Sequence, residues 1–212
     1  MHHNVGYLCL VKNALAKRFG DHRVHELPVS EGKVPLLILD LELATPVNVL
    51  VTNGLREKRM NVPEREKGKE HIELFFCLPS YWEWDDLNNP NTNWVYEVIQ
   101  RLSEYLLEND DAWFGNGHTI NARKDGTSLS STMKQDHLIL LNPLLLEEAM
   151  APIQVGDTEV NFLSIVPIFS DEWDYKQSKG TVKFVRKLIN KGVSEKLDDF
   201  RTSVLRSKWR IW

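Results

Sequence analysis

Apolar and polar side chains alternate along several short stretches of the chain, and this alternation predicts β-strands. Residues 33–44 alternate in their second half, and residues 47–55 follow after Pro46, so these two strands are expected to pair antiparallel. Residues 70–79 form a third expected strand. One of its faces carries Ile72, Leu74, Phe76 and Leu78, and the other carries His71, Glu73, Phe75 and Cys77. Further strands are expected over residues 118–123, 136–143 and 159–169.

Apolar positions spaced three and four residues apart predict the helices. The clearest helix covers residues 94–108, and its buried stripe is Val95, Val98, Ile99, Leu102 and Leu106. A first helix is expected over residues 4–19, and Ser170 is expected to cap a later one. A helix around residues 182–190 is expected to bury Val182, Val185, Leu188 and Ile189. A last helix, capped by Ser194, is expected to run toward Trp209, whereas the charged residues 56–70 indicate a surface loop.

The order of these elements indicates an α+β (mixed α/β) fold, in which a largely antiparallel or mixed central sheet is flanked by helices. The chain has 212 residues, 42% of them apolar, which is enough for one compact domain. We therefore expect a single domain over residues 1–212, with an N-terminal helix at 4–19 and a basic helical tail at 193–212. Because no apolar run approaches the roughly 20 residues that span a bilayer, no membrane contact is expected.

Cysteine usage bears on the compartment in which the protein works. The two cysteines, Cys9 and Cys77, are too few for a disulfide framework, and both lie in apolar contexts. Buried thiols in a reducing compartment are therefore expected. Residues 1–20 contain a short apolar patch without a small-residue cleavage site, so they are interpreted as a helix and not as an export signal. These features predict a cytoplasmic protein.

Charge is distributed unevenly along the chain. The net charge is −4, yet residues 176–212 hold eleven Lys and Arg residues against three Asp and Glu residues. The rest of the chain is therefore strongly acidic, and its acids cluster next to tryptophans. An acidic body favours a basic partner and speeds encounter with it. Solvated acidic faces without a partner are the alternative interpretation.

His71, Glu73 and Cys77 are the candidate catalytic residues. Their spacing is similar to part of a zinc deaminase site, but that chemistry also needs a Cys-x-x-Cys pair, and the chain has none. On a strand the three side chains share one face, where a packed or hydrogen-bonded trio is the interpretation we favour. A small metal- or cysteine-dependent hydrolase centred on them, with His118 as a further imidazole, is the alternative.

Four stretches carry a resemblance to a known family. They are VLVTNGL (49–55), HIELFFCLPSYW (71–82), the long helix with its glycine loop and strand (94–120), and FLSIVPIFSDEWDY (162–175). In order and spacing they resemble the Suppressor of fused (SUFU) domain family, over a core of about residues 24–192. The resemblance implies a mixed-sheet domain that has no catalytic residues and no cofactor or metal, and that acts by binding another protein.

The resemblance also implies a site and a role. The family grips its partners near the end of the long helix and the following loop, here Tyr105 and residues 110–118, and Gly117 stands where the animal form has an acidic residue. Compact bacterial members resemble immunity proteins, so the expected partner is a cognate, basic toxin domain. Nucleic-acid binding through the basic tail, with Trp209 and Trp212, is the weaker alternative. Acid-flanked aromatic residues and the family's gripping region together give the predicted partner-binding set: Trp82, Trp84, Asp85, Asp86, Tyr105, Asp110, Asp111, Trp113 and Trp173.

Overall fold

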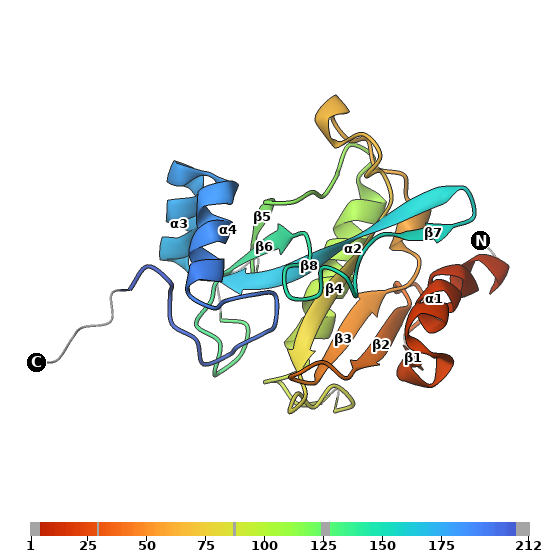
Figure 1. Cartoon of the computed structure of the whole chain (residues 1–212), viewed down its shortest axis with the longest axis horizontal. Helices are drawn as coiled ribbons and strands as arrows, with labels where there is room; N and C mark the ends of the chain where they lie inside the picture. The colour runs from red at the N-terminus through yellow and green to blue at the C-terminus, as the bar shows by residue number, and fades with distance from the viewer. Residues whose placement is uncertain (1–4, 29, 87, 124–127, 207–212) are drawn as a thin grey trace, which may run out of the picture.

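A central sheet of eight strands organises the chain in a computed structural model (Figure 1). The structure describes residues 5–28, 30–86, 88–123 and 128–206, with side chains from Leu10 onward. The strand order is β1-β2-β3-β4-β8-β6-β5, and β7 pairs with β8. The strands are β1 (Val24–Leu27), β2 (Leu36–Leu41), β3 (Val47–Thr52), β4 (Ile72–Pro79), β5 (Thr119–Asn121), β6 (His137–Leu141), β7 (Ile153–Val155) and β8 (Thr158–Ile168).

The pairing confirms the expected mixed sheet. β2 and β3 pair antiparallel, as the short connection at Pro46 predicts. Every other neighbouring pair is also antiparallel, except for the central β4 and β8, which run parallel. The sequence pattern missed β1 and β7, which have only four and three residues.

Each face of the sheet has its own core. The helix α2 (Trp94–Glu108) covers one face, and α1 (Val5–Phe19) lies on the other (Figure 1). Strand β4 contributes to both cores as expected: Ile72, Leu74, Phe76 and Leu78 pack with α2, whereas Phe75 and Cys77 pack on the opposite side. A third cluster joins β6 and β8 to α3 (Ser170–Lys179) and α4 (Thr181–Asn190), which lie side by side at one end of the sheet.

The expected helix from Ser194 toward Trp209 is wrong over its described part. Residues 193–206, here called the closing segment, contain no helix. The backbone N–H of Leu197 donates to the Cys77 carbonyl at 2.8 Å, beside the end of β4. The buried Glu195 carboxylate accepts three backbone N–H groups, from Leu144, Leu145 and Leu146, at 2.8–3.0 Å. Long-range contacts therefore take the place of the helical hydrogen bonds. Trp209, with the rest of 207–212, lies outside the described residues.

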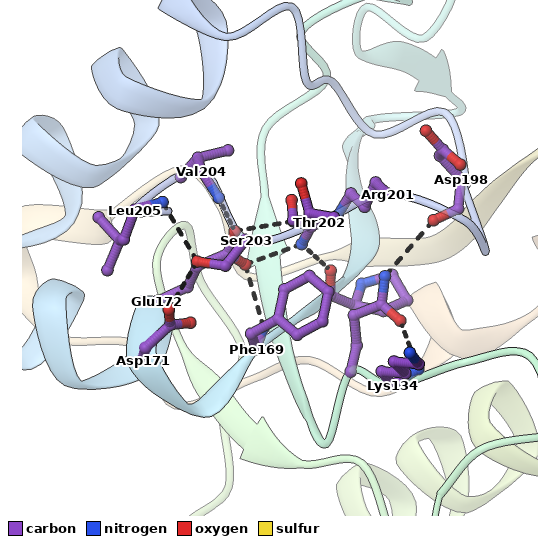
Figure 2. A network of polar contacts seen from close by, with 12 residues as sticks. Lys134, Phe169, Asp171, Glu172, Asp198, Arg201, Thr202, Ser203, Val204 and Leu205 are labelled. Atoms are coloured by element: carbon purple, nitrogen blue, oxygen red, sulfur yellow. Dashed lines mark hydrogen bonds and ion pairs between the residues drawn. The ribbon is translucent and has the colours of Figure 1, made fainter. Parts of the chain in front are cut away.

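An ion pair fixes the far part of the closing segment (Figure 2). The Arg201 guanidinium binds both oxygens of the buried Glu172 carboxylate at 2.7 and 2.8 Å. That carboxylate also accepts the backbone N–H groups of Phe169 and Val204, at 3.0 and 2.9 Å. The Glu172 carboxylate therefore accepts a free backbone N–H group at the N-terminus of α3. Ser170, the expected cap, is instead the first residue of the helix.

Two further expectations about burial need correction. On α4, Phe184 and Leu188 are the buried residues, while Val182 and Ile189 are 71% and 56% exposed. Residues 56–70 are not entirely a surface loop, because Arg56 and Met60 are buried among the residues of the core. Short 3-10 turns at Asp21–Arg23, Leu55–Glu57 and Glu64–Glu66 complete the described elements. Within the described residues, no helix is both long and apolar enough to cross a membrane.

Candidate functional site at the outer edge of the sheet

The strand β5 forms one edge of the sheet, and within the described residues no strand pairs with its outer side. His118 and Ala122 make backbone hydrogen bonds to Leu140 and Asp136 on the β6 side. Because backbone groups alternate in direction along an antiparallel strand, Thr119 presents its N–H and C=O groups to the open edge. The Asn121 carbonyl also points away from β6, but it accepts a hydrogen bond from the Arg101 guanidinium at 3.3 Å. An edge of this kind is able to accept one more extended chain.

A groove of about 840 Å³ runs along this open edge. Helix α2 forms one wall, residues 109–118 form its end, and Lys176 of α3 reaches in from the other side. The lining residues on which the argument rests are Tyr105, Glu108, Trp113, His118, Thr119 and Lys176. The groove thus combines aromatic surface, an unpaired strand edge and charges of both signs.

Two glycines allow the groove's end loop to fold tightly. Gly117 has φ +91°, and a Cβ there would lie 2.4 Å from the Oγ1 atom of Thr181, at the start of α4. Its N–H donates to the Leu140 carbonyl at 2.7 Å. A Cβ on Gly115 would meet the Trp113 ring at 2.6 Å. Only residues without a side chain fit both positions, so the loop holds Trp113 and His118 beside β5.

His118 and Lys176 are two of the basic side chains that line the groove, and Lys176 affects the titration of His118. Burial, and then the nearby Lys176 ammonium, lower the pKa of His118, which favours the neutral imidazole. The His118 ring packs edge-on against the Trp113 ring, with 4.2 Å between the two ring centroids. Burial also lowers the pKa of Lys176, and among the described residues no carboxylate forms an ion pair with it. The Lys176 ammonium is therefore available in the groove to bind a hydrogen-bond acceptor of a ligand.

Acidic and aromatic side chains form the rim. Tyr105 is 53% exposed, and its ring stacks on the Phe114 ring. Glu108 and Asp111 are exposed, and Asp110 forms an ion pair with Lys58 that lowers the pKa of the Asp110 carboxyl. This rim suits a partner that carries both apolar and basic groups.

The residues of the predicted partner-binding set do not lie together in one place. Tyr105 and Trp113 line the groove, and Asp110 and Asp111 begin its end loop. Trp84, Asp85 and Asp86 lie at the opposite end of α2, where the Tyr96 hydroxyl donates to the Trp84 carbonyl. A 15-residue helix is about 22 Å long, so one small contact cannot include both ends.

The two remaining tryptophans, Trp82 and Trp173, pack against other aromatic rings of the fold. Trp82 is only 4% exposed and packs edge-on against Trp94 in the core, so its ring is not on the surface. Trp173 is half-buried and stacks on His137, at 5.0 Å between centroids. Sequence reasoning did not include Thr119 and Lys176 in the site. No local pattern could have found them, because their roles depend on which strand is the edge.

Glu73 and its neighbours are the other candidate site. The carboxylate is fully buried, and it accepts the Thr52 hydroxyl and the backbone N–H groups of Gly54, Leu55 and Arg56, at 2.9–3.3 Å for the three N–H groups. Burial raises the pKa of this carboxyl to about 7, and the four hydrogen bonds act in the opposite direction. Glu73 therefore holds the turn of residues 54–56, which agrees with the hydrogen-bonded role favoured for it from the sequence.

The other two members of the trio also have structural environments. The His71 imidazole lies 2.7 Å from the Arg56 carbonyl, on the turn that Glu73 holds. Cys77 is buried, and burial raises the pKa of its thiol, which disfavours the nucleophilic thiolate. Over the described part of the chain, no three His, Cys, Asp or Glu side chains are grouped so that they could hold a metal ion. Cys9 lies outside the residues whose side chains are described.

Comparisons with known proteins agree on the fold. The family model for Suppressor of fused protein (SUFU) matches residues 32–202, well over half of the chain. No curated protein matches the chain. The crystal structure of a SUFU homologue from Neisseria gonorrhoeae is similar, with a TM-score of 0.70 and 16% identity. It covers 97% of this chain and 100% of that one.

Two further solved structures are similar to this chain. The crystal structure of the Sufu–Fu complex has a TM-score of 0.65 and 19% identity, covering 93% of this chain and 92% of that one. Drosophila Suppressor of Fused has a TM-score of 0.65 and 18% identity over 93% of this chain, which spans only 51% of the Drosophila chain. At such identities the three structures establish the fold.

Proposed function

The chain belongs to the Suppressor of fused (SUFU) family, and on that basis we propose that it is a non-catalytic protein whose groove along β5 binds an extended segment of another protein. The observation that carries this proposal is the position of β5, whose outer backbone groups face an open groove with aromatic walls. The Sufu–Fu complex, a structure of the same fold, contains a SUFU protein bound to another protein.

Strand addition explains how the groove would hold its partner. The backbone N–H and C=O groups of Thr119 would supply hydrogen bonds that do not depend on the partner's sequence. Selectivity would come from side chains: apolar groups of the partner pack on Tyr105 and Trp113, and an acceptor meets Lys176. Such interfaces obtain most of their binding energy from a few aromatic anchors.

We propose further that the partner is a basic toxin domain and that the protein acts in the cytoplasm as its immunity protein. Two observations support this role. The chain outside residues 176–212 is strongly acidic, Glu108 lines the groove, and Asp110 and Asp111 lie in the loop at its end. Binding would neutralise the toxin by occluding its surface, with no chemical step. Complex formation would then weaken with increasing salt, because the attraction between opposite charges is screened.

Capture of the toxin and rescue of cell growth together test the proposal. The full chain, expressed with a neighbouring toxin gene, should form a stable complex and restore growth, whereas Tyr105→Ala should lose both. Tyr81→Ala is the matched control, since Tyr81 is 61% exposed, bonds Asp199 and lies outside the groove. If Tyr105→Ala binds and rescues as well as the unaltered chain, the groove is not the partner site. If a complex forms without rescue, the immunity role fails while the binding role stands.

The hydrolase alternative keeps one clear test. The Cys77→Ala and Glu73→Gln variants should each still bind the partner, as long as the variant protein is folded. Turnover of a small ester or amide that depends on either side chain would contradict the non-catalytic proposal.

A further inference from the structure

The side chains of β5 point alternately to the two walls of the groove along this strand, here called the β5 groove. Thr119 pairs with Ile139, which belongs to the apolar cluster that joins β6 and β8 to α3 and α4. The Thr119 Oγ1 atom also accepts a hydrogen bond from the Gln177 side chain of α3 at 3.4 Å. Ile120 pairs with Leu138 and packs with the cluster that contains α2. The Thr119 side chain therefore lies on the α3 side of the sheet, and the Ile120 side chain lies on the α2 side.

This alternation decides which wall each residue of an added strand would meet. A residue directly opposite Thr119 has its side chain on the same face as Thr119, so that side chain would point to α3. The side chains of its two neighbours would point to the α2 side. Tyr105 and Trp113 offer their rings on that side, because Tyr105 stacks on Phe114 of the α2 cluster and Trp113 packs against the same cluster.

Lys176 supplies the charge on the α3 wall of the groove, and no acceptor within the described residues satisfies its ammonium. The other charged side chains of the groove differ from it. The Glu104 carboxylate forms an ion pair with Lys33, and the Arg101 guanidinium donates to two backbone carbonyls at the end of β5. Glu108, on the α2 wall, is exposed and has the opposite charge. An acidic side chain is therefore favoured on the α3 side of the groove and disfavoured on the α2 side.

On the basis of the function proposed above, we propose that the segment bound along β5 carries an Asp or Glu opposite Thr119, with an apolar residue on each side of it, and that Lys176 selects this acid. The carboxylate accepts hydrogen bonds from the half-buried Lys176 ammonium, and a hydrogen bond between charged groups is stronger than one between neutral groups. The two apolar neighbours pack on the rings of Tyr105 and Trp113.

The recognised pattern is thus apolar–acidic–apolar, and it applies to the inserted segment alone. The remaining surface of the partner would meet the acidic residues at the rim, Glu108, Asp110 and Asp111. A basic domain that presents one acidic residue on an extended loop would fit both parts of the site, because the two charges are read by different residues. Lys176 therefore determines specificity, whereas Tyr105 and Trp113 provide most of the contact area.

Selection of phage-displayed random peptides on the immobilised full chain tests this specificity. The unaltered chain should enrich peptides with Asp or Glu between two apolar residues. Lys176→Glu should enrich Lys or Arg at that position, because the charge on the α3 wall is reversed. Lys179→Glu is the matched control, since Lys179 is an exposed lysine in the same last turn of α3 and does not line the groove. It should enrich the same peptides as the unaltered chain.

Fluorescence polarisation with one enriched peptide measures the size of the effect. Replacing the acid of the peptide with its amide, Asp with Asn or Glu with Gln, should weaken binding to the unaltered chain by about tenfold. The same replacement should not weaken binding to Lys176→Glu, because that variant has no cation for the acid to meet. Circular dichroism of each variant shows that it is folded.

Three results would overturn the inference, and only the last also contradicts the proposed function. Peptides without an acidic preference, whose binding is lost in Tyr105→Ala, would leave the groove as a binding site that Lys176 does not control. An acidic preference that persists in Lys176→Glu would assign the selection to another cation. The third result is that no peptide is enriched, or that the enriched peptides bind Tyr105→Ala as well as the unaltered chain.

Discussion

Arg201 and Glu172 form a buried ion pair that joins the closing segment to the first turn of α3, with nitrogen–oxygen distances of 2.7 and 2.8 Å. Neither side chain is more than 7% exposed. The Arg201 guanidinium also donates to the Pro167 carbonyl at 2.7 Å and lies over the Phe169 ring. Two separate parts of the chain therefore depend on one charged contact.

Removing one partner of this pair should be costly. Arg201→Ala leaves the Glu172 carboxylate buried without a countercharge, so we expect the free energy of unfolding to fall by about 3–5 kcal/mol. Urea denaturation followed by circular dichroism measures the change. Arg206→Ala, an exposed arginine in the same segment, should change it by less than about 0.5 kcal/mol. Equal effects of the two substitutions would show that the ion pair has no special role.

The buried Glu73 carboxyl should make stability depend on pH. Its pKa is about 7 in the folded chain, against 4.5 for an ordinary glutamate. Between these values the folded chain binds a proton that the unfolded chain releases, so this group's contribution to stability is lost as pH rises through 7. The difference amounts to at most about 3 kcal/mol.

Glu73→Gln isolates that contribution. The difference in stability between pH 5 and pH 8 should become smaller in this variant than in the unaltered chain, as measured by urea denaturation at each pH. Glu147→Gln, at an exposed carboxyl, should leave the pH profile unchanged. An unaltered profile in Glu73→Gln would mean that Glu73 stays ionised in the folded chain throughout this range.

Gly117→Ala should destabilise the loop that ends the β5 groove. The new methyl group would meet Thr181, and φ +91° is itself unfavourable for alanine, so we expect a loss of about 2–3 kcal/mol. Gly32→Ala is a matched control, because Gly32 has φ +81° with no atom within 4 Å of the new Cβ. It should cost only about 1 kcal/mol. Thermal unfolding compares the two, and similar losses would assign the whole effect to the backbone conformation.

Proline substitutions along β5 should separate binding from folding. Thr119 directs its N–H to the open edge, so Thr119→Pro should leave stability nearly unchanged while it abolishes partner capture. Ile120 faces β6 and pairs with Leu138, so Ile120→Pro should destabilise the sheet itself. Capture assays beside denaturation curves distinguish the two. Full capture by a folded Thr119→Pro chain would exclude strand addition at this edge.

Local patterns predicted what local interactions decide. Helix α2 has the bounds that its stripe of Val95 to Leu106 indicates, and β4 divides its side chains between two cores as its alternation predicts. The same reasoning did not separate Trp82 from Trp113, which have similar acidic neighbours in sequence. One packs against Trp94 in the core and the other lines the groove, and only the tertiary arrangement determines which.

The errors have the same origin. Apolar spacing on α4 does not reveal which of its apolar residues meet the sheet, so Val182 and Ile189 were expected to be buried. A polar, charged segment such as residues 193–206 does not reveal that Leu197 will bond to Cys77 or Arg201 to Glu172. Of the residues around the candidate groove, the sequence pointed to Tyr105, Trp113 and the loop of residues 110–118. Lys176 and the open edge of β5 required the strand order.

The parallel pair formed by β4 and β8 at the centre of the sheet also governs how the chain is made. Strand β4 has apolar faces on both sides, and its outer edge stays unpaired until residues 158–168 leave the ribosome, on the order of seconds later. During that interval the nascent sheet exposes an unpaired apolar strand, which favours aggregation. Slow codons before residue 158 should therefore lower the yield of this protein more than slow codons after residue 168.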